Sequence, residues 1–348
     1  MAFIAGRYNV KYDVGGTPFY IGQLDGLHLN YSFSAADIRG DSYGDTWQDG
    51  VYRGGNCQLR FTLTKYSAPN LAKVFWPFNA TFGKVGTLGV LASSLAKQIT
   101  LEAADGTPAE STDIGGGAIG WPRIITANYA ILTPGHVAEF DLTPSLRVIP
   151  IELTLLPWDD TGTIRWFTSA TSGSTTDPAA VGGFIAGPYT VTYDGVSVGQ
   201  TNGIRLGWRM HAQPITGDAY GDSIQDFVYR GGDVWVSMVL NEYTAAAGRK
   251  AFWPYYTTGA AETDVGIMSN AASPIGRLLS GLAKPLVLTP VANTPAASAG
   301  HTFTIDKAIL SPGTPIQLLY EHALRTVPLR FNCVPQGAIG SEEWFVPS

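Results

Sequence analysis

The sequence predicts a mainly β protein with two tandem, duplicated antiparallel β-sandwich or barrel domains, each with one short helix and long loops. Three observations lead to this prediction: the composition, an internal repeat and a period-two alternation of apolar residues. Only 14% of the 348 residues are charged, whereas the chain contains 41 glycines, 22 prolines, 9 tryptophans and 16 tyrosines. Such a composition favours turns and half-buried strands over long amphipathic helices.

The repeat divides the chain into two copies of one domain. Residues 40–55 (GDSYGDTWQDGVYRGG) match residues 217–232 (GDAYGDSIQDFVYRGG) at 12 of 16 positions, with a constant offset of 177. Further matches follow in the same order, among them AGRYNVKYD (5–13) with AGPYTVTYD (186–194), FWPF (75–78) with FWPY (252–255) and AILTPG (130–135) with AILSPG (308–313). Because such regular matches mark repeated structural units, we expect copy 1 at 1–168 and copy 2 at 182–348.

A short linker is expected between the copies. Residues 169–181 (SATSGSTTDPAAV) are rich in Ser, Thr and Gly, a composition typical of flexible linkers. A coil of this length spans roughly 20 Å. The two domains can therefore lie side by side.

Alternating apolar residues predict the strands of each copy. Every second side chain is apolar in 57–64 (CQLRFTLT), in 234–240 (VWVSMVL) and in 327–333 (VPLRFNC). This pattern is typical of strands that pack on one side. Cys57 and Cys333 stand at apolar positions of these strands, so we expect both to be buried small hydrophobic residues without a chemical role.

A short helix follows the alternating strand in each copy. Ser67 and Thr244 can act as N-caps, and a proline ends each helix. The tryptophan before that proline is expected to anchor the core; the two pairs are Trp76–Pro77 and Trp253–Pro254. Near the start of copy 1, the glycines at 15–16 predict a β-hairpin.

The residues that catalysis would require are not shared between the copies. No histidine has a histidine at the equivalent position; the five are His28, His136, His211, His301 and His322. The segment GGGAIG (115–120) lacks the strand, helix and downstream acid of a dinucleotide-binding fingerprint. We therefore expect no catalytic residues, no metal, no cofactor and no enzyme activity.

Charge and hydropathy limit the partners. A net charge of −6 argues against a surface that grips the phosphate backbone, which requires clustered Lys and Arg. The chain has no run of 18 apolar residues and does not begin like a signal peptide. We expect synthesis in a cytoplasm and no membrane partner.

Three acidic positions recur in both copies of the repeated stretch. They are Asp41, Asp45 and Asp49 in copy 1, and Asp218, Asp222 and Asp226 in copy 2. Two alternatives remain: a bound cation, for which the spacing is wide, or aspartates that cap turns and pair with Arg53 or Arg230 in an ordered loop. The tripeptide RGD (39–41) is not repeated, because Thr216 replaces Arg39, so we do not interpret it as an adhesion motif.

The order of these elements resembles the tail tube proteins of long-tailed, siphovirus-type bacteriophages, in particular versions with two tandem tube domains. The resemblance rests on a β-hairpin, a polar loop with the pattern D-x-Y-G-D, an alternating strand, a short helix that ends in an aromatic cluster, and late strands. It covers most of both copies. What it implies is therefore a structural virion protein of the phage tail.

In that family six β domains form a ring, and rings stack into a tube. Two domains per chain then imply a homotrimer with pseudo-sixfold symmetry, assembled in the host cytoplasm. The implied partners are further copies of the chain and other tail proteins, such as the tape measure, terminator and distal tail proteins. About 24 lumen strands at ~4.8 Å spacing would enclose a channel of roughly 40 Å, through which DNA passes during ejection without specific binding.

The loops at 37–55 and 214–232 are the expected contacts between subunits and rings. The candidate residues in these assembly loops are Asp41, Tyr43, Asp45, Asp49, Arg53, Asp218, Tyr220, Asp222, Asp226 and Arg230. Two other functions stay open. One is a distal tail or baseplate protein that forms a single ring. The other is a duplicated β-sandwich carbohydrate-binding protein, which the Trp and Tyr content would suit.

Overall fold

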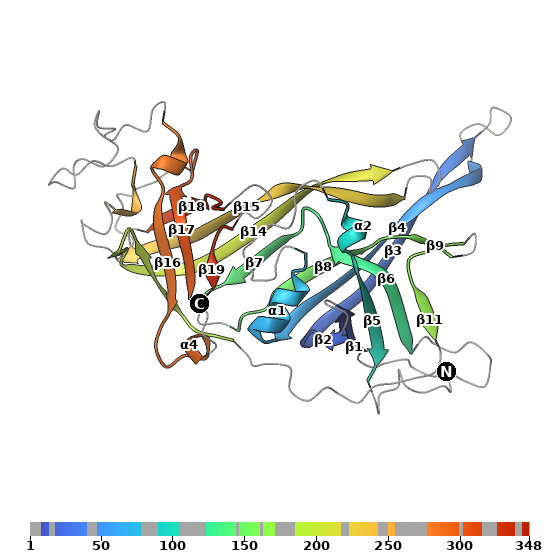
Figure 1. Ribbon diagram of the computed structural model, residues 1–348, viewed down its shortest axis with the longest axis horizontal. Helices are drawn as coiled ribbons and strands as arrows, with labels where there is room; N and C mark the ends of the chain where they lie inside the picture. Colours follow the sequence, from blue (N-terminus) through green and yellow to red (C-terminus); the bar gives the residue numbers. More distant parts are fainter. Residues whose placement is uncertain are drawn as a thin grey trace.

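Two large antiparallel sheets dominate the computed structural model of the protein (Figure 1). The described residues are 8–13, 18–39, 47–77, 90–104, 123–143, 146–160, 163–170, 185–216, 223–242, 250–254, 277–298, 302–314, 326–337 and 343–347. Their helices are few and short. The predicted fold class, a mainly β protein with two β domains, is confirmed.

The first sheet is built from the first half of the chain. Its strands are β1 (Tyr8–Asp13), β2 (Pro18–Tyr20), β3 (Gln23–Arg39), β4 (Trp47–Lys65), β5 (Lys97–Ala103), β6 (Ile124–Leu132), β8 (Ile149–Leu155) and β11 (Thr168–Ala170). The strand order is β2-β1-β5-β6-β8-β4-β3, and β11 pairs with β6. The first residues of the expected linker, 169 and 170, thus belong to a strand.

The second sheet repeats this arrangement. Its strands are β12 (Tyr189–Tyr193), β13 (Val196–Ser197), β14 (Gln200–Thr216), β15 (Ile224–Glu242), β16 (Lys284–Pro290), β17 (Phe303–Leu310), β18 (Val327–Cys333) and β19 (Val346–Pro347), joined by β7 (Val137–Asp141). The order β13-β12-β16-β17-β18-β15-β14 matches the first sheet strand for strand, and β19 pairs with β17 as β11 pairs with β6. The sequence repeat is therefore a structural repeat, with β7 as an addition at the edge.

Two long hairpins occupy most of the segments expected to be loops. Strands β3 and β4 pair from Gln23 and Lys65 to Arg39 and Trp47, and β14 and β15 pair over the same length. The expectation of loops at 37–55 and 214–232 is wrong for the described residues; 40–46 and 217–222 lie outside them. Gly54 and Gly231 have φ of 130° and 115° and lie at matching bulges, where glycine lets a strand bend without ending.

Smaller elements lie between the strands of the two sheets. They are the two-stranded sheet of β9 (Trp158–Asp160) and β10 (Thr163–Arg165), the helices α1 (Ala68–Val74), α2 (Ala92–Leu95) and α4 (Pro295–Ser298), and the 3-10 helix η5 (Leu279–Gly281). Ser67 caps α1, since its side chain accepts a hydrogen bond from the backbone N–H of Asn70 at 3.3 Å. This cap is as predicted, whereas Thr244 lies outside the described residues. Strands β1 and β2 form the expected first hairpin, whose glycine turn is also outside them.

The tryptophans at the ends of the helical segments anchor the core as predicted. Trp76 donates from Nε1 to the carbonyl of Leu95 at 2.6 Å, and Trp253 donates to the carbonyl of Leu282 at 2.7 Å. Both rings pack, partly buried, against the core. Equivalent tryptophans thus make equivalent bonds, which supports the alignment of the two copies.

Buried apolar side chains from both copies form one continuous core. The inward faces of the alternating strands supply most of it. Cys57 and Cys333 lie in this core as free, buried thiols, which confirms the prediction for both. Burial raises the pKa of the Cys57 thiol to about 12, so the reactive thiolate is scarce at neutral pH.

Candidate functional site

The junction between the two copies is built around strand β7. This strand follows the AILTPG turn of copy 1, yet it pairs with β14 of copy 2, from Val137 opposite Arg209 to Asp141 opposite Arg205. Leu142 and Gly135, which flank β7, extend the ladder, since their N–H groups donate to the carbonyls of Ile204 and Met210. Copy 1 thus adds a strand to the sheet of copy 2.

An aromatic cluster fills the space beneath this strand pair. The ring of Phe75 lies 5.8 Å from that of Phe140 on β7 and 5.0 Å from that of Trp208 on β14. Phe140 in turn lies 6.5 Å from Phe303 of copy 2. Trp208 and Phe140 are each only 1% exposed, so the junction has the packing of a domain core.

Polar bonds continue the junction along the long hairpin of copy 2. The buried carboxylate of Asp226 accepts from the backbone N–H of Ser93 at 2.8 Å and from the Ser93 hydroxyl. Farther on, the hydroxyl of Ser223 accepts from the backbone N–H of Gly55 at 2.7 Å. Helix α2 and strand β4 of copy 1 therefore both hold the hairpin β14–β15, which lies across copy 1 in Figure 1.

The structure separates the predicted assembly residues into four groups. Six lie outside the described residues: Asp41, Tyr43, Asp45, Asp218, Tyr220 and Asp222. Asp49 lies on β4, but its side chain is also outside them. Arg53 and Arg230 are exposed on their strands, and Asp226 lies in the junction.

Of the two alternatives for the repeated acids, pairing of aspartate with arginine within one copy is wrong for Asp226. Its carboxylate instead bonds to Ser93 of copy 1, whereas Arg230 donates to the amide oxygen of Gln213. The partner is 133 residues away in sequence, so no local pattern marks it. The cation alternative gains no support here, because both carboxylate oxygens of Asp226 accept hydrogen bonds from Ser93.

Sequence reasoning missed the apolar residues of the junction. Ala138 and Phe140 are buried at alternate positions of β7, as expected for a strand with one buried face. Copy 2 carries Ile316 and Leu318 at the equivalent positions, after the shared Pro-Gly turn. This repeated pair of apolar residues in a five-residue segment could have identified the strand.

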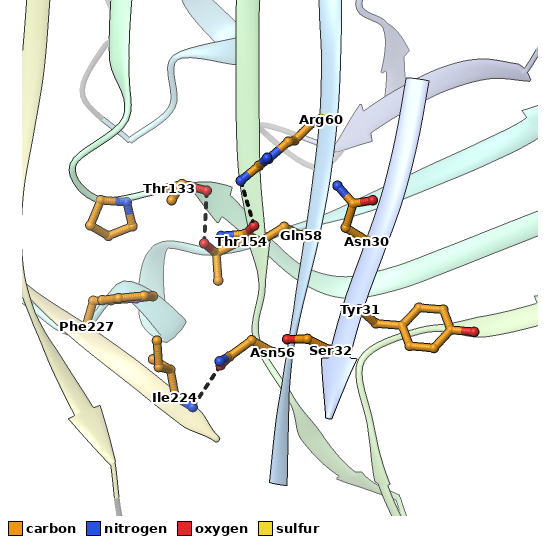
Figure 2. Close-up of a pocket in the computed structure, with 11 residues that line it drawn as sticks. Asn30, Tyr31, Ser32, Asn56, Gln58, Arg60, Thr133, Thr154, Ile224 and Phe227 are labelled. Atoms are coloured by element: carbon orange, nitrogen blue, oxygen red, sulfur yellow. Dashed lines mark hydrogen bonds between the residues drawn. The ribbon is translucent and has the colours of Figure 1, made fainter. Parts of the chain in front are cut away.

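A cavity of about 470 Å³ opens beside the junction (Figure 2). Its described lining comes from both copies: Asn30, Tyr31, Ser32, Asn56, Gln58, Arg60, Thr133, Pro134, Thr154, Ile224 and Phe227. This lining includes no carboxylate, histidine or cysteine, and the hydroxyls of Thr133 and Thr154 bond to each other at 3.0 Å. The lining offers hydrogen-bonding groups without a paired acid and base.

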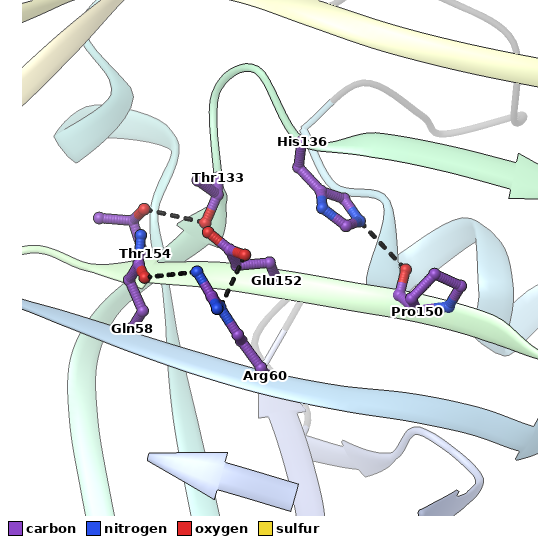
Figure 3. A network of polar contacts seen from close by, with 7 residues as sticks. All are labelled: Gln58, Arg60, Thr133, His136, Pro150, Glu152 and Thr154. Carbon is purple, nitrogen blue, oxygen red and sulfur yellow. Dashed lines mark hydrogen bonds and ion pairs between the residues drawn. The ribbon is translucent and has the colours of Figure 1, made fainter. Parts of the chain in front are cut away.

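The polar side chains next to this cavity bond to one another and to the backbone (Figure 3). Arg60 forms an ion pair with Glu152, Nε to Oε2 at 2.8 Å, and donates from Nη2 to Gln58 at 3.1 Å. His136 lies 3.1 Å from the carbonyl of Pro150, Nε2 to O. Burial lowers the pKa of His136, so this imidazole is mostly neutral at pH 7.

Within the described ranges, no group of three His, Cys, Asp or Glu side chains is placed to hold a metal ion. No helix in those ranges is long and apolar enough to cross a membrane. The chain matches no protein-family model, and no curated protein matches its sequence.

Proposed function

We propose that this chain is the subunit of a bacteriophage tail tube, a structural virion protein that assembles with copies of itself. One observation carries the proposal: two domains with the same strand order are joined edge to edge by β7. The junction is heterologous, since the contributing surface of copy 1 differs from the receiving surface of copy 2. Repetition of a heterologous contact produces a closed ring or an open filament.

A ring of three chains fits this arrangement. Each chain contributes two β domains, so three chains supply six domains with pseudo-sixfold symmetry. Ring closure also covers the edge strand β3, the last strand of its sheet among the described residues, because an open edge attracts unwanted strands. The net charge of −6 suits a channel through which DNA slides, because an acidic wall repels the phosphate backbone.

Negative-stain electron microscopy of the purified chain, dilute and concentrated, tests the proposal. We expect threefold rings with a central hole that stack into tubes as concentration rises. Monomers at every concentration would contradict it. Rings that never stack would favour the distal tail or baseplate alternative, and sugar binding by a persistent monomer would favour the carbohydrate-binding alternative.

A further inference from the structure

Strands β3 and β14 occupy equivalent places but differ in what covers them. Trp208 and Met210 on β14 are 1% and 2% exposed, beneath the junction with copy 1. The equivalent residues on β3, at the constant offset of 177, are Tyr31 and Phe33, which are 58% and 62% exposed. Their rings contact each other, with centroids 5.5 Å apart. Copy 1 thus presents an aromatic surface where copy 2 has a core.

A second pair of exposed residues is equivalent to another contact of the junction. Leu91 next to α2, itself 45% exposed, forms a β-bridge with the partly buried Val228 of the long hairpin. The equivalent of Leu91 is Leu278, 82% exposed, and the equivalent of Val228 is Val51, 55% exposed. The residues equivalent to Trp208, Met210, Val228 and Leu91 are therefore exposed. They are Tyr31, Phe33 and Val51 on copy 1, and Leu278 on copy 2.

The two sets of exposed residues lie on different copies of the repeat. Strand β3 is the last strand of its sheet among the described residues, whereas β14 has β7 beyond it. The outer ends of β3 and β4 project from the body of the molecule, in contrast to the hairpin of copy 2 (Figure 1). The exposed surface on copy 1 is equivalent to the surface of copy 2 that receives copy 1. A domain with the fold of copy 1 therefore fits it, and copy 2 has the same strand order.

The sequence also supplies a counterpart of β7. Residues 315–319 (PIQLL) follow the same Pro-Gly turn in copy 2 as 137–141 (VAEFD) follow in copy 1. Their apolar residues at 316 and 318 match the buried Ala138 and Phe140. Residues 315–319 lie outside the described residues.

We propose that the second domain of one chain docks on β3 of another copy of the chain, by repetition of the internal junction. Leu278 of the docked domain then lies opposite Val51, as Leu91 lies opposite Val228 within the chain. The occupant of the exposed aromatic surface is a second copy of this chain. This inference rests on the proposed function and specifies its contact between subunits.

Disulfide trapping tests the contact directly. Opposed residues of an antiparallel bridge have Cα atoms about 4.5–5.5 Å apart, which suits a disulfide. In the full chain, the double variant Val51→Cys with Leu278→Cys should give covalent trimers after mild oxidation of the concentrated protein, on non-reducing gels. A single exposed cysteine links at most two chains, so each single variant should stop at dimers.

The internal junction provides a matched control. The variant Leu91→Cys with Val228→Cys should lose its two added thiols while it stays one chain in size, because that bridge lies within the molecule. Trapped trimers without stacked tubes would support the contact and contradict the tube. Rings seen by microscopy without trapped trimers would contradict the contact alone. Absence of both rings and trapped trimers would contradict both proposals.

Discussion

Strands β3 and β14 have nearly the same shape, length and bulges, yet opposite surroundings. Both are 17 residues long, and their register shifts fall at equivalent places, for example after Ser34 and after His211. Trp208 is buried by copy 1, whereas Tyr31 is 58% exposed. Burial at this position therefore depends on a neighbouring domain, which duplication supplies once within the chain.

Burial of the exposed aromatic side chains of β3 would contribute free energy to assembly. Complete burial of a large apolar side chain contributes about 1.5–3 kcal/mol. Tyr31 and Phe33 together could therefore supply a substantial part of a contact, although association also costs translational and rotational freedom. Truncation of the buried Trp208 should mainly affect folding, whereas truncation of the exposed Tyr31 should mainly affect assembly.

The largest expected effect comes from truncation of Trp208. Trp208→Ala should lower the free energy of unfolding by about 3–5 kcal/mol, because it leaves a cavity beside Phe75. Tyr31→Ala should lower it by about 1 kcal/mol or less and yet weaken assembly at least about tenfold. Urea unfolding of dilute protein and sedimentation of concentrated protein measure the two effects; equal loss of stability in both variants would refute the asymmetry.

A smaller loss is expected at Asp226. Asp226→Ala removes the acceptor of the Ser93 N–H and hydroxyl, and an unsatisfied buried donor costs about 1–3 kcal/mol. Asp226→Asn keeps one acceptor oxygen and should retain more stability. Urea unfolding midpoints would settle this; an alanine variant as stable as the parent would show that the bonds do not hold the hairpin.

Charge reversal of the repeated acids should affect stacking and leave folding unchanged. Asp45→Lys with Asp222→Lys changes the predicted assembly loops in both copies, and surface substitutions usually alter stability by less than about 0.5 kcal/mol. We expect rings with shorter or no tubes in micrographs, with an unaltered circular dichroism spectrum. Tubes of normal length would remove these residues from the stacking contact.

The smallest effect concerns His136. Burial lowers its pKa below the usual 6.5, although the carbonyl of Pro150 opposes this shift. The unfolded chain therefore binds the proton more readily, so stability is fully present above pH 6.5 and falls as the pH drops below it. His136→Thr, the residue that copy 2 has at this position, should reduce the difference in unfolding free energy between pH 7.5 and pH 5. An unchanged difference would contradict this role.

Local patterns were sufficient for much of the fold. The repeat predicted two domains, and the alternation around Cys57 and Cys333 predicted strands that are present, because one-sided burial imposes a period of two. The glycines of the repeated stretch misled, since Gly54 and Gly231 bend strands at bulges and do not end them.

The junction itself could be predicted only in part. The repeat predicted Asp226 as a contact between subunits or rings, whereas the structure shows a bond within the chain to Ser93, 133 residues away in sequence. The segment 137–141 is compatible with pairing to either copy, and the choice depends on tertiary geometry. The apolar pattern of a five-residue segment does not show which distant strand the segment pairs with.

Native mass spectrometry of the assembled protein measures how many chains form a ring. A ring built by repetition of the junction should contain three chains, with a mass of three times 37.1 kDa, about 111 kDa, and larger particles should be multiples of that unit. A species that stays at 37.1 kDa at all concentrations, or one that closes as a dimer, would contradict a ring built by repetition of the junction.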